Sequence, residues 1–332
     1  MKCFICNNEA IIKDKYRKGF QKPDIFQIYY CDSCKTTFSF PQVSEIDFYE
    51  KIYNDSSLHS GYARYKIYAE NIKKQSSPLE YLSAQEEVYW AVNKSISEIV
   101  DCKKDSKILE IGCGMGYLTF ALHKAGFNIL GLDISQKAID YAIKMYGDFY
   151  ICADIFEYSK KNSNKFDIVI LTEVIEHVTN PIEFLKEIKK LLTDKGKIIV
   201  STPENPLSKY VWNTDIPPIH QWWFSKESMK FIGDKLQLSS KFVDFSEFYK
   251  ENYLKISTST KHSFDYNNRH FIDEKGELIS RVSQKQKIPI IKSHLSKISL
   301  LKNYYHLSLR ILNWIYYLYN KKGRIICVIY EN

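Results

Sequence analysis

The feature that most constrains the fold is an apolar run that enters a glycine-rich turn. Residues 107–111 are largely apolar, and Gly112, Gly114 and Gly116 follow at every second position. The next apolar run ends in a carboxylate, Asp133. A strand that leads into closely spaced glycines, with an acidic residue at the end of the following strand, is typical of a nucleoside site at the carboxyl edge of a parallel sheet.

The glycine spacing separates two classes of cofactor. A dinucleotide turn reads G-x-G-x-x-G and cradles a pyrophosphate at a helix N-terminus. In this chain Tyr117 stands where the last of those glycines would be, and Asp133 is not followed by an arginine suited to a 2′-phosphate. The turn therefore argues against NAD.

The same residues resemble motif I of the class I S-adenosylmethionine-dependent methyltransferases. The resemblance implies that Glu110 orders the turn and the amino group of the cofactor, that Asp133 binds the ribose, and that Asp154 reaches the adenine. Alone, each residue is equally explained as a turn glycine or a helix-capping aspartate, but four matching positions in order favour the family. The implied cofactor-binding residues are Glu110, Gly112, Gly114, Gly116, Asp133, Ile134, Asp154, Ile155 and Glu173.

Strand and helix patterns alternate along the rest of the chain. The expected strands are 107–111, 128–132, 149–152, 166–171, 196–201, 241–245 and 324–330, and the expected helices are 79–100, 117–125, 136–145, 181–192 and 226–235. This alternation predicts an α/β fold in which helices cover both faces of a parallel sheet. The last strand of the family is antiparallel. The resemblance therefore implies a Rossmann-like fold with a seven-stranded, mostly parallel sheet.

The predicted organisation has five parts. They are a zinc ribbon (1–45), a helical linker or lid (46–106), the S-adenosylmethionine-binding core (107–245), a mostly helical insertion (246–322) and the last strand of the core sheet (323–332).

Four of the eight cysteines form two CxxC pairs, Cys3 with Cys6 and Cys31 with Cys34. Each CxxC turn presents two thiolates to one tetrahedral metal, so the spacing predicts a Cys₄ zinc site. Because all four ligands come from protein, the zinc is expected to be structural. Metal binding would supply about 10 to 16 kcal/mol to a segment too small to bury its own core. The single cysteines are interpreted as small core residues.

The stretch 29–41, rich in aromatic residues, resembles the zinc-ribbon leader of bacterial methyltransferases in surface-polysaccharide and deoxysugar pathways. The resemblance implies a nucleotide-linked or lipid-linked sugar as the acceptor. It also implies that residues 46–76 pack over the cofactor mouth, with Tyr62 and Tyr65 as lid aromatics; ordinary packing of these tyrosines is the alternative.

Three residues are candidates for the catalytic base. His220 lies in a loop of prolines and aromatics after the fifth strand and resembles the family's acceptor-side histidine. A hydroxyl that attacks a methyl group needs a base, and histidine has a suitable pKa. His177 and Glu204 are the other candidates. His177 and Glu176 could instead cap the helix that starts near Pro181, and His220 could simply pack between tryptophans.

Composition and charge indicate which partners and which cellular location to expect. The chain has 332 residues and a net charge of +8, but its lysines are scattered, so nucleic acid is not expected as a partner. With no signal peptide and no membrane-spanning run, we expect a cytoplasmic protein. Residues 298–319 combine a wide apolar face with basic charges. This face could lie on the inner side of the membrane, on a partner, against the core, or between the copies of a homodimer.

These features favour O-methylation of a sugar or similar small molecule. An RNA methyltransferase would commonly carry an N-P-P-Y-type or cysteine motif at the fourth strand, and residues 172–175 have neither. Sugar C-methyltransferases carry an acid directly before the acceptor-side histidine, where this chain has Ile219. A silent cofactor-binding scaffold would have lost Glu110 or Asp133.

Overall fold

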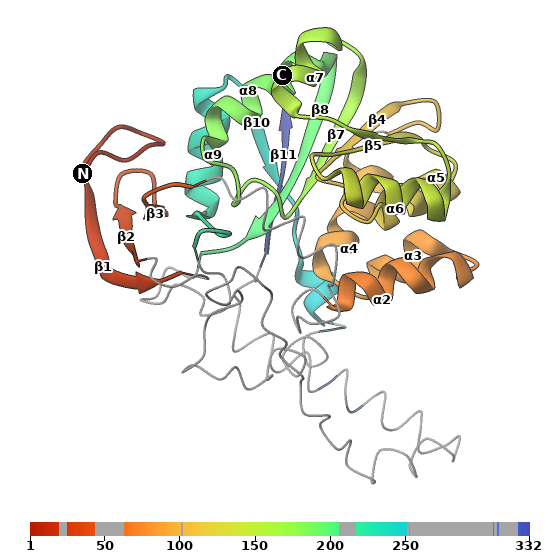
Figure 1. Cartoon of the computed structure of the whole chain (residues 1–332), viewed down its shortest axis with the longest axis horizontal. Coiled ribbons are helices and arrows are strands. Elements are labelled where there is room, and N and C mark those ends of the chain that lie inside the picture. Colours follow the sequence, from red (N-terminus) through yellow and green to blue (C-terminus); the bar gives the residue numbers. More distant parts are fainter. Residues whose placement is uncertain are drawn as a thin grey trace.

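The computed structural model of the chain describes residues 1–19, 25–43, 63–100, 102–205, 217–250 and 325–332, with the single residues 252, 308 and 311. Two sheets organise this part of the chain, one of four strands and one of seven (Figure 1).

The seven-stranded sheet confirms the predicted Rossmann-like α/β core. Its order is β10-β11-β8-β7-β4-β5-β6. The strands are β4 (Lys107–Ile111), β5 (Asn128–Asp133), β6 (Tyr150–Cys152), β7 (Phe166–Thr172), β8 (Leu192–Pro203), β10 (Ser239–Phe242) and β11 (Ile325–Glu331). Strands β4 to β8 run parallel, whereas β11 pairs antiparallel with β8 and with β10. The strand order reverses between β4 and β7, which is where open α/β sheets bind ligands.

Helices cover both faces of this sheet (Figure 1). Successive residues of β4, Ile108 and Leu109, enter two separate cores, as the alternation of a strand requires. One core is closed by α2 (Ala63–Asn71), α3 (Pro78–Ser83), α4 (Glu87–Lys94) and α5 (Tyr117–Lys124), and the other by α7 (Ile155–Lys161), α8 (Pro181–Leu191) and α9 (Lys226–Lys235). Helix α6 (Gln136–Tyr146) packs against β5 and β6.

The single helix predicted over residues 79–100 is wrong. The segment forms α3, a turn, α4 and then a π-helical turn (Ser95–Ile99). The physical reason lies in the apolar spacing, because Leu82 and Val88 are six residues apart and two helical turns need about seven. In the turn, Glu86 accepts a hydrogen bond from the hydroxyl of Tyr68 at 2.7 Å, which fixes the break.

Other elements also differ from the sequence prediction. Strand β8 starts at Leu192 and not at residue 196. The strand expected at residues 241–245 is β10 (Ser239–Phe242), whose register against β11 is set by pairing of Ser239 with Glu331. Helix α7 was not expected, and it begins where the side chain of Asp154 caps the backbone.

The predicted insertion 246–322 lies outside the described residues except for 246–250, 252, 308 and 311. Phe248 is buried beside Trp90, with ring centroids 5.6 Å apart. The expected apolar helix 298–319 falls almost wholly outside the described part. Within that part, no helix is long and apolar enough to cross a membrane.

The four-stranded sheet joins the N-terminal segment to the loop after β8. Its order is β1-β2-β3-β9, formed by β1 (Ala10–Lys18), β2 (Ile25–Cys31), β3 (Thr36–Phe40) and β9 (Trp222–Trp223). We call β1 to β3 with the CxxC turns the ribbon. It lies beside α9 (Figure 1), where Nζ of Lys235 donates to the carbonyl of Ile5 at 2.8 Å.

Candidate active site

The glycine turn after β4 needs glycine for conformational and steric reasons. Gly112, Gly114 and Gly116 have φ angles of 73°, 51° and 77°, in the left-handed region. A Cβ on Gly112 would lie 2.4 Å from Cγ2 of Val174, and one on Gly116 would lie 2.6 Å from the ring of Tyr150. The turn therefore presents bare backbone at the carboxyl edge of the sheet, as a nucleoside cofactor requires.

Asp133 holds this turn. Its Oδ2 accepts from the backbone N–H of Gly114 at 2.7 Å, and its Oδ1 accepts from that of Ser135 at 2.9 Å. A carboxylate oxygen can accept more than one hydrogen bond, so Asp133 could also accept from a ribose hydroxyl. Ile134, which follows, exposes its side chain beside the turn.

Glu110 is buried below the turn. Its Oε2 accepts a hydrogen bond from the hydroxyl of Thr119. Burial raises the pKa of Glu110 to about 8, and the charge of Asp133 contributes to the rise. The carboxyl is therefore mostly neutral at pH 7 without a cofactor, and a cation placed against it would favour its charged form.

Asp154 acts as a helix cap in this structure. Its Oδ1 accepts from the N–H groups of Phe156 and Glu157 at 2.8 and 3.3 Å. Ile155, the first residue of α7, is buried. The contact of Asp154 with an adenine stays a prediction.

Aromatic residues of the predicted lid segment pack beside the glycine turn. Tyr117, directly after Gly116, stacks on Tyr65 with a 6.5 Å centroid separation and shares a 2.6 Å hydrogen bond with the hydroxyl of Tyr89. Nη2 of Arg64 donates to the hydroxyl of Tyr65 at 2.9 Å. The other lid candidate, Tyr62, lies outside the described residues. The role of this segment as a lid stays a prediction.

The loop after β7 lies against the glycine turn. Glu173, at its start, has a φ of 56°, a left-handed conformation that costs about 1–3 kcal/mol in a residue other than glycine. The next residue, Val174, is the one that a Cβ on Gly112 would meet. The alternative that Glu176 and His177 cap α8 is wrong, because the side chain of Asn180 accepts from the backbone at that helix start.

Glu176, His177 and His220 converge at this loop, and we call them the Glu-His-His cluster. The two imidazole rings meet edge to face, with centroids 4.5 Å apart. Nδ1 of His177 is 2.9 Å from the carbonyl of Ile219, and Oε2 of Glu176 accepts from the hydroxyl of Thr202 at 3.0 Å. Burial lowers the pKa of His220 to about 3, so its ring is neutral at physiological pH. In the cofactor-free protein His220 is therefore a weaker base than the sequence prediction assumed.

The segment that carries His220 is held from both sides. The Gln221 amide donates from Nε2 to the carbonyl of His177 at 2.9 Å, and its Oε1 accepts from the N–H of Val43 at 3.0 Å. The backbone N–H of Gln221 donates to the carbonyl of Glu176 at 2.9 Å. Sequence reasoning missed Gln221, and it named Glu176 only as a possible cap. Glu204, the third predicted candidate, directly follows β8 and forms an isolated bridge with Phe224.

Residues 84–239 match the family described as a methyltransferase domain. This region is a class I S-adenosylmethionine-dependent methyltransferase domain. Its sheet order and glycine turn agree with that assignment.

Curated relatives of this domain include O-methyltransferases. The ubiquinone biosynthesis O-methyltransferase of Rickettsia bellii is 30% identical over 149 residues, which are 44% of this chain and 59% of that protein. The protein of the same name from Coxiella burnetii is 34% identical over 115 residues, which are 33% of this chain and 48% of that protein. The chain spans about half the length of the curated relatives it matches.

Among solved structures, phosphoethanolamine N-methyltransferase 2 of Haemonchus contortus, in complex with phosphomonomethylethanolamine and S-adenosylhomocysteine, has a TM-score of 0.51 at 15% identity. The match covers 89% of this chain and 61% of that one. At this identity the likeness is one of fold.

The four ribbon cysteines gather at one point outside the methyltransferase domain. Sγ atoms of Cys3 and Cys34 are 3.6 Å apart, and those of Cys6 and Cys31 are 3.3 Å apart. Four thiolates at 2.3 Å from a tetrahedral zinc would be about 3.8 Å from one another, so these side chains fit such an ion with small shifts. Of the single cysteines, Cys113 and Cys327 are buried core residues as predicted, whereas Cys102 and Cys152 are only partly buried.

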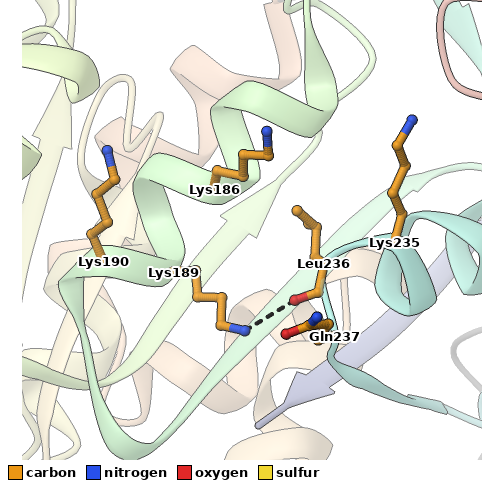
Figure 2. A pocket seen from close by; sticks show the side chains of 6 residues that line it. All are labelled: Lys186, Lys189, Lys190, Lys235, Leu236 and Gln237. Carbon is orange, nitrogen blue, oxygen red and sulfur yellow. Dashed lines mark hydrogen bonds between the residues drawn. The ribbon is translucent and has the colours of Figure 1, made fainter.

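A lysine-lined hollow lies away from this site. It has a volume of about 450 Å³ and is lined by Lys186, Lys189, Lys190, Lys235, Leu236 and Gln237, as Figure 2 shows. Nζ of Lys189 is engaged there by the carbonyl of Leu236 at 2.9 Å. The hollow is on the ends of α8 and α9, near the amino end of β8, and its lining includes no carboxylate, histidine or cysteine.

Proposed function

We propose that the chain is an S-adenosylmethionine-dependent O-methyltransferase that acts on a small hydroxylated acceptor. The observation that carries the proposal is the packing of Val174 against Gly112, because it joins the glycine turn to the loop that holds Glu176 and His177. Groups able to take a proton thus lie beside the turn on which the methionine part of the cofactor would rest.

The residues suggest a direct transfer. The cofactor supplies an electrophilic methyl group when bound. The acceptor hydroxyl approaches from the side of the Glu-His-His cluster, and its oxygen bonds to the methyl carbon as the carbon–sulfur bond breaks. The proton passes to the cluster, where Nδ1 of His220 is buried and has no hydrogen-bond partner among the described residues.

For the acceptor we propose a nucleotide-linked or lipid-linked sugar. The support is the resemblance of residues 29–41 to the leader of polysaccharide and deoxysugar methyltransferases. A phenolic acceptor is the second candidate, since the curated relatives are named for ubiquinone biosynthesis. Both acceptors present a hydroxyl.

We further propose that Cys3, Cys6, Cys31 and Cys34 hold one structural zinc. The support is the convergence of the four thiols within 4.8 Å. The ion would have no open position, so it would stabilise the ribbon and take no part in methyl transfer.

Cofactor binding is tested first, by calorimetry with S-adenosylmethionine, S-adenosylhomocysteine and NAD. We expect binding of the first two and none of NAD. Asp133→Ala should abolish binding, because it removes both the ribose acceptor and the bond that holds Gly114. Failure of the wild-type protein to bind either adenosyl ligand would refute the proposal.

Turnover is tested next with nucleotide sugars and dihydroxybenzoates as methyl acceptors. His220→Ala should lower turnover by about 10² to 10⁴ while affinity for S-adenosylhomocysteine stays near that of the wild type. His123→Ala, on α5, is the control. If His220→Ala keeps full turnover while His177→Ala abolishes it, the proton acceptor lies on the loop after β7.

A further inference from the structure

Three side chains with metal-binding atoms meet in the Glu-His-His cluster. One ligand atom from each of Glu176, His177 and His220 lies within 4.8 Å of the other two. Two of these residues follow β7 and the third follows β8, so the fold brings together segments that are distant in sequence.

His177 is oriented as a ligand would be. A carbonyl oxygen only accepts, so the 2.9 Å contact with Ile219 places the ring proton of neutral His177 on Nδ1. The lone pair is then on Nε2, which lies 3.8 Å from Oε1 of Glu176. A histidine whose outer nitrogen is held by a backbone carbonyl is the usual arrangement around a bound metal ion.

The other two residues of the cluster are also arranged to bind a cation. The hydroxyl of Thr202 donates to Oε2 of Glu176 at 3.0 Å, which fixes the carboxylate with Oε1 toward His177. Nδ1 of His220 is buried with no hydrogen-bond partner in the described part of the chain. Burial of an unpaired polar atom costs free energy, and a cation would remove that cost.

We propose that Glu176, His177 and His220 bind a divalent cation whose open positions face the acceptor. Two imidazoles and one carboxylate suit a first-row ion such as Zn²⁺, Fe²⁺ or Mn²⁺. Metal–ligand distances of about 2.1 Å place neighbouring ligand atoms roughly 3.0 to 3.4 Å apart. Binding would therefore draw the three side chains together by about 1 Å.

Such an ion would determine which class of acceptor binds. This inference rests on the proposed O-methylation. Open positions on one ion suit two neighbouring oxygens, as in a vicinal diol of a sugar or an ortho-dihydroxybenzene. The ion lowers the pKa of a bound hydroxyl. His220, as a metal ligand, then no longer takes the proton, which passes to water. The resulting oxygen anion then bonds to the methyl carbon as the carbon–sulfur bond breaks.

Manganese binding tests the site without reference to activity. Mn²⁺ is the probe, because carboxylate and water ligands suit it better than the thiols of the ribbon. Titration of the full chain, with its ribbon zinc retained, is followed by electron paramagnetic resonance. We expect one Mn²⁺ per chain. In nuclear magnetic resonance the ring signals of His177 and His220 should broaden, whereas those of His123, stacked on Phe149, should not.

Variants test whether Mn²⁺ binds at the Glu-His-His cluster. Glu176→Gln and His220→Ala should each raise the Kd for Mn²⁺ by about 100-fold, and Thr202→Val, which removes a positioning residue, by about tenfold. His123→Ala should bind Mn²⁺ like the wild type. Retained affinity for S-adenosylhomocysteine reports folding. If the Glu176→Gln variant fails to fold because Glu176 is fully buried, His220→Ala, at a less buried residue, still supplies the test.

No Mn²⁺ binding by the wild type, or unchanged binding by His220→Ala, would overturn the proposal. Methyl transfer that persists in full after chelation of added metal would refute the proposed ion site without refuting O-methylation. Mn²⁺ binding at the cluster, without methyl transfer to any hydroxyl, would support the ion site and refute the proposed function.

Discussion

At the residue scale, the buried Glu110 makes the stability of the fold depend on pH. Its pKa is about 8 in the folded protein, against 4.5 for an unperturbed glutamate. Between these values the folded state binds more protons than the unfolded state, so this residue makes stability fall as pH rises from about 4.5 to 8. Above pH 8 its effect is constant.

The variant Glu110→Gln should therefore stabilise the cofactor-free protein. Its melting temperature should equal that of the wild type near pH 5 and exceed it increasingly toward pH 8, because the amide never ionises in the core. If Glu110 binds the amino group of the cofactor as predicted, the variant's affinity for S-adenosylhomocysteine at pH 8 should fall at least about tenfold, because that ion pair would be lost. Thermal denaturation from pH 5 to 8 and calorimetry check the two effects.

The exposed Glu98→Gln is the matched control and should alter neither property. A Glu110→Gln variant less stable than the wild type at pH 8 would show that the carboxyl is charged in the cofactor-free protein.

At the element scale, the segment around β9 depends on one buried amide. Gln221→Ala leaves the carbonyl of His177 and the N–H of Val43 without their partner, so unfolding free energy should fall by about 1–3 kcal/mol. Turnover should fall more than affinity for S-adenosylhomocysteine, because the amide holds the cluster and not the glycine turn. Denaturant titration and steady-state kinetics measure both. Gln136→Ala, at the exposed start of α6, should change neither.

The ribbon should lose its metal and its order before the core sheet does. In the double variant Cys31→Ser, Cys34→Ser we expect zinc content to fall from one per chain to a small fraction. Tryptophan fluorescence should shift to the red, since Trp222 packs on Phe38 with centroids 5.7 Å apart. Binding of S-adenosylhomocysteine should persist.

The matched control for the ribbon is the double variant Cys102→Ser, Cys152→Ser, which should keep its zinc. Full zinc content in the ribbon variant would place the ligands elsewhere in the chain.

Most strands and helices of the core were predictable, because each has its own apolar periodicity and its own start and stop residues in the sequence. Helix α9 occupies the predicted residues, and Pro78 opens α3 as expected. The six-residue gap between Leu82 and Val88 is a sequence signal for the break near Glu86, but the contact with Tyr68 that fixes the break is not visible in the sequence. In the same way the sequence marked His177 and His220 separately, but their meeting with Glu176 depends on pairing between distant loops.

At the scale of the whole molecule, the ribbon covers apolar surface of the methyltransferase domain. Trp222 is 1% exposed and Ile232 is fully buried, in one core with Ile5 and Phe38 of the ribbon. Deletion of residues 1–43 should therefore expose a contiguous apolar patch, and the shortened chain should self-associate and bind a hydrophobic dye. Light scattering and dye fluorescence measure this. A monodisperse, dye-negative truncated chain would show that the ribbon covers little.

The pairing of β3 with β9 also sets a delay during synthesis. Ser39 and Gln221 are hydrogen-bonded although 182 residues separate them. A ribosome adds about 5 to 20 residues per second, so β9 is synthesised roughly 10 to 40 s after β3. Over that interval the edge of β3 and the ring of Phe38 are uncovered on the nascent chain, which makes them the surface a chaperone would meet first.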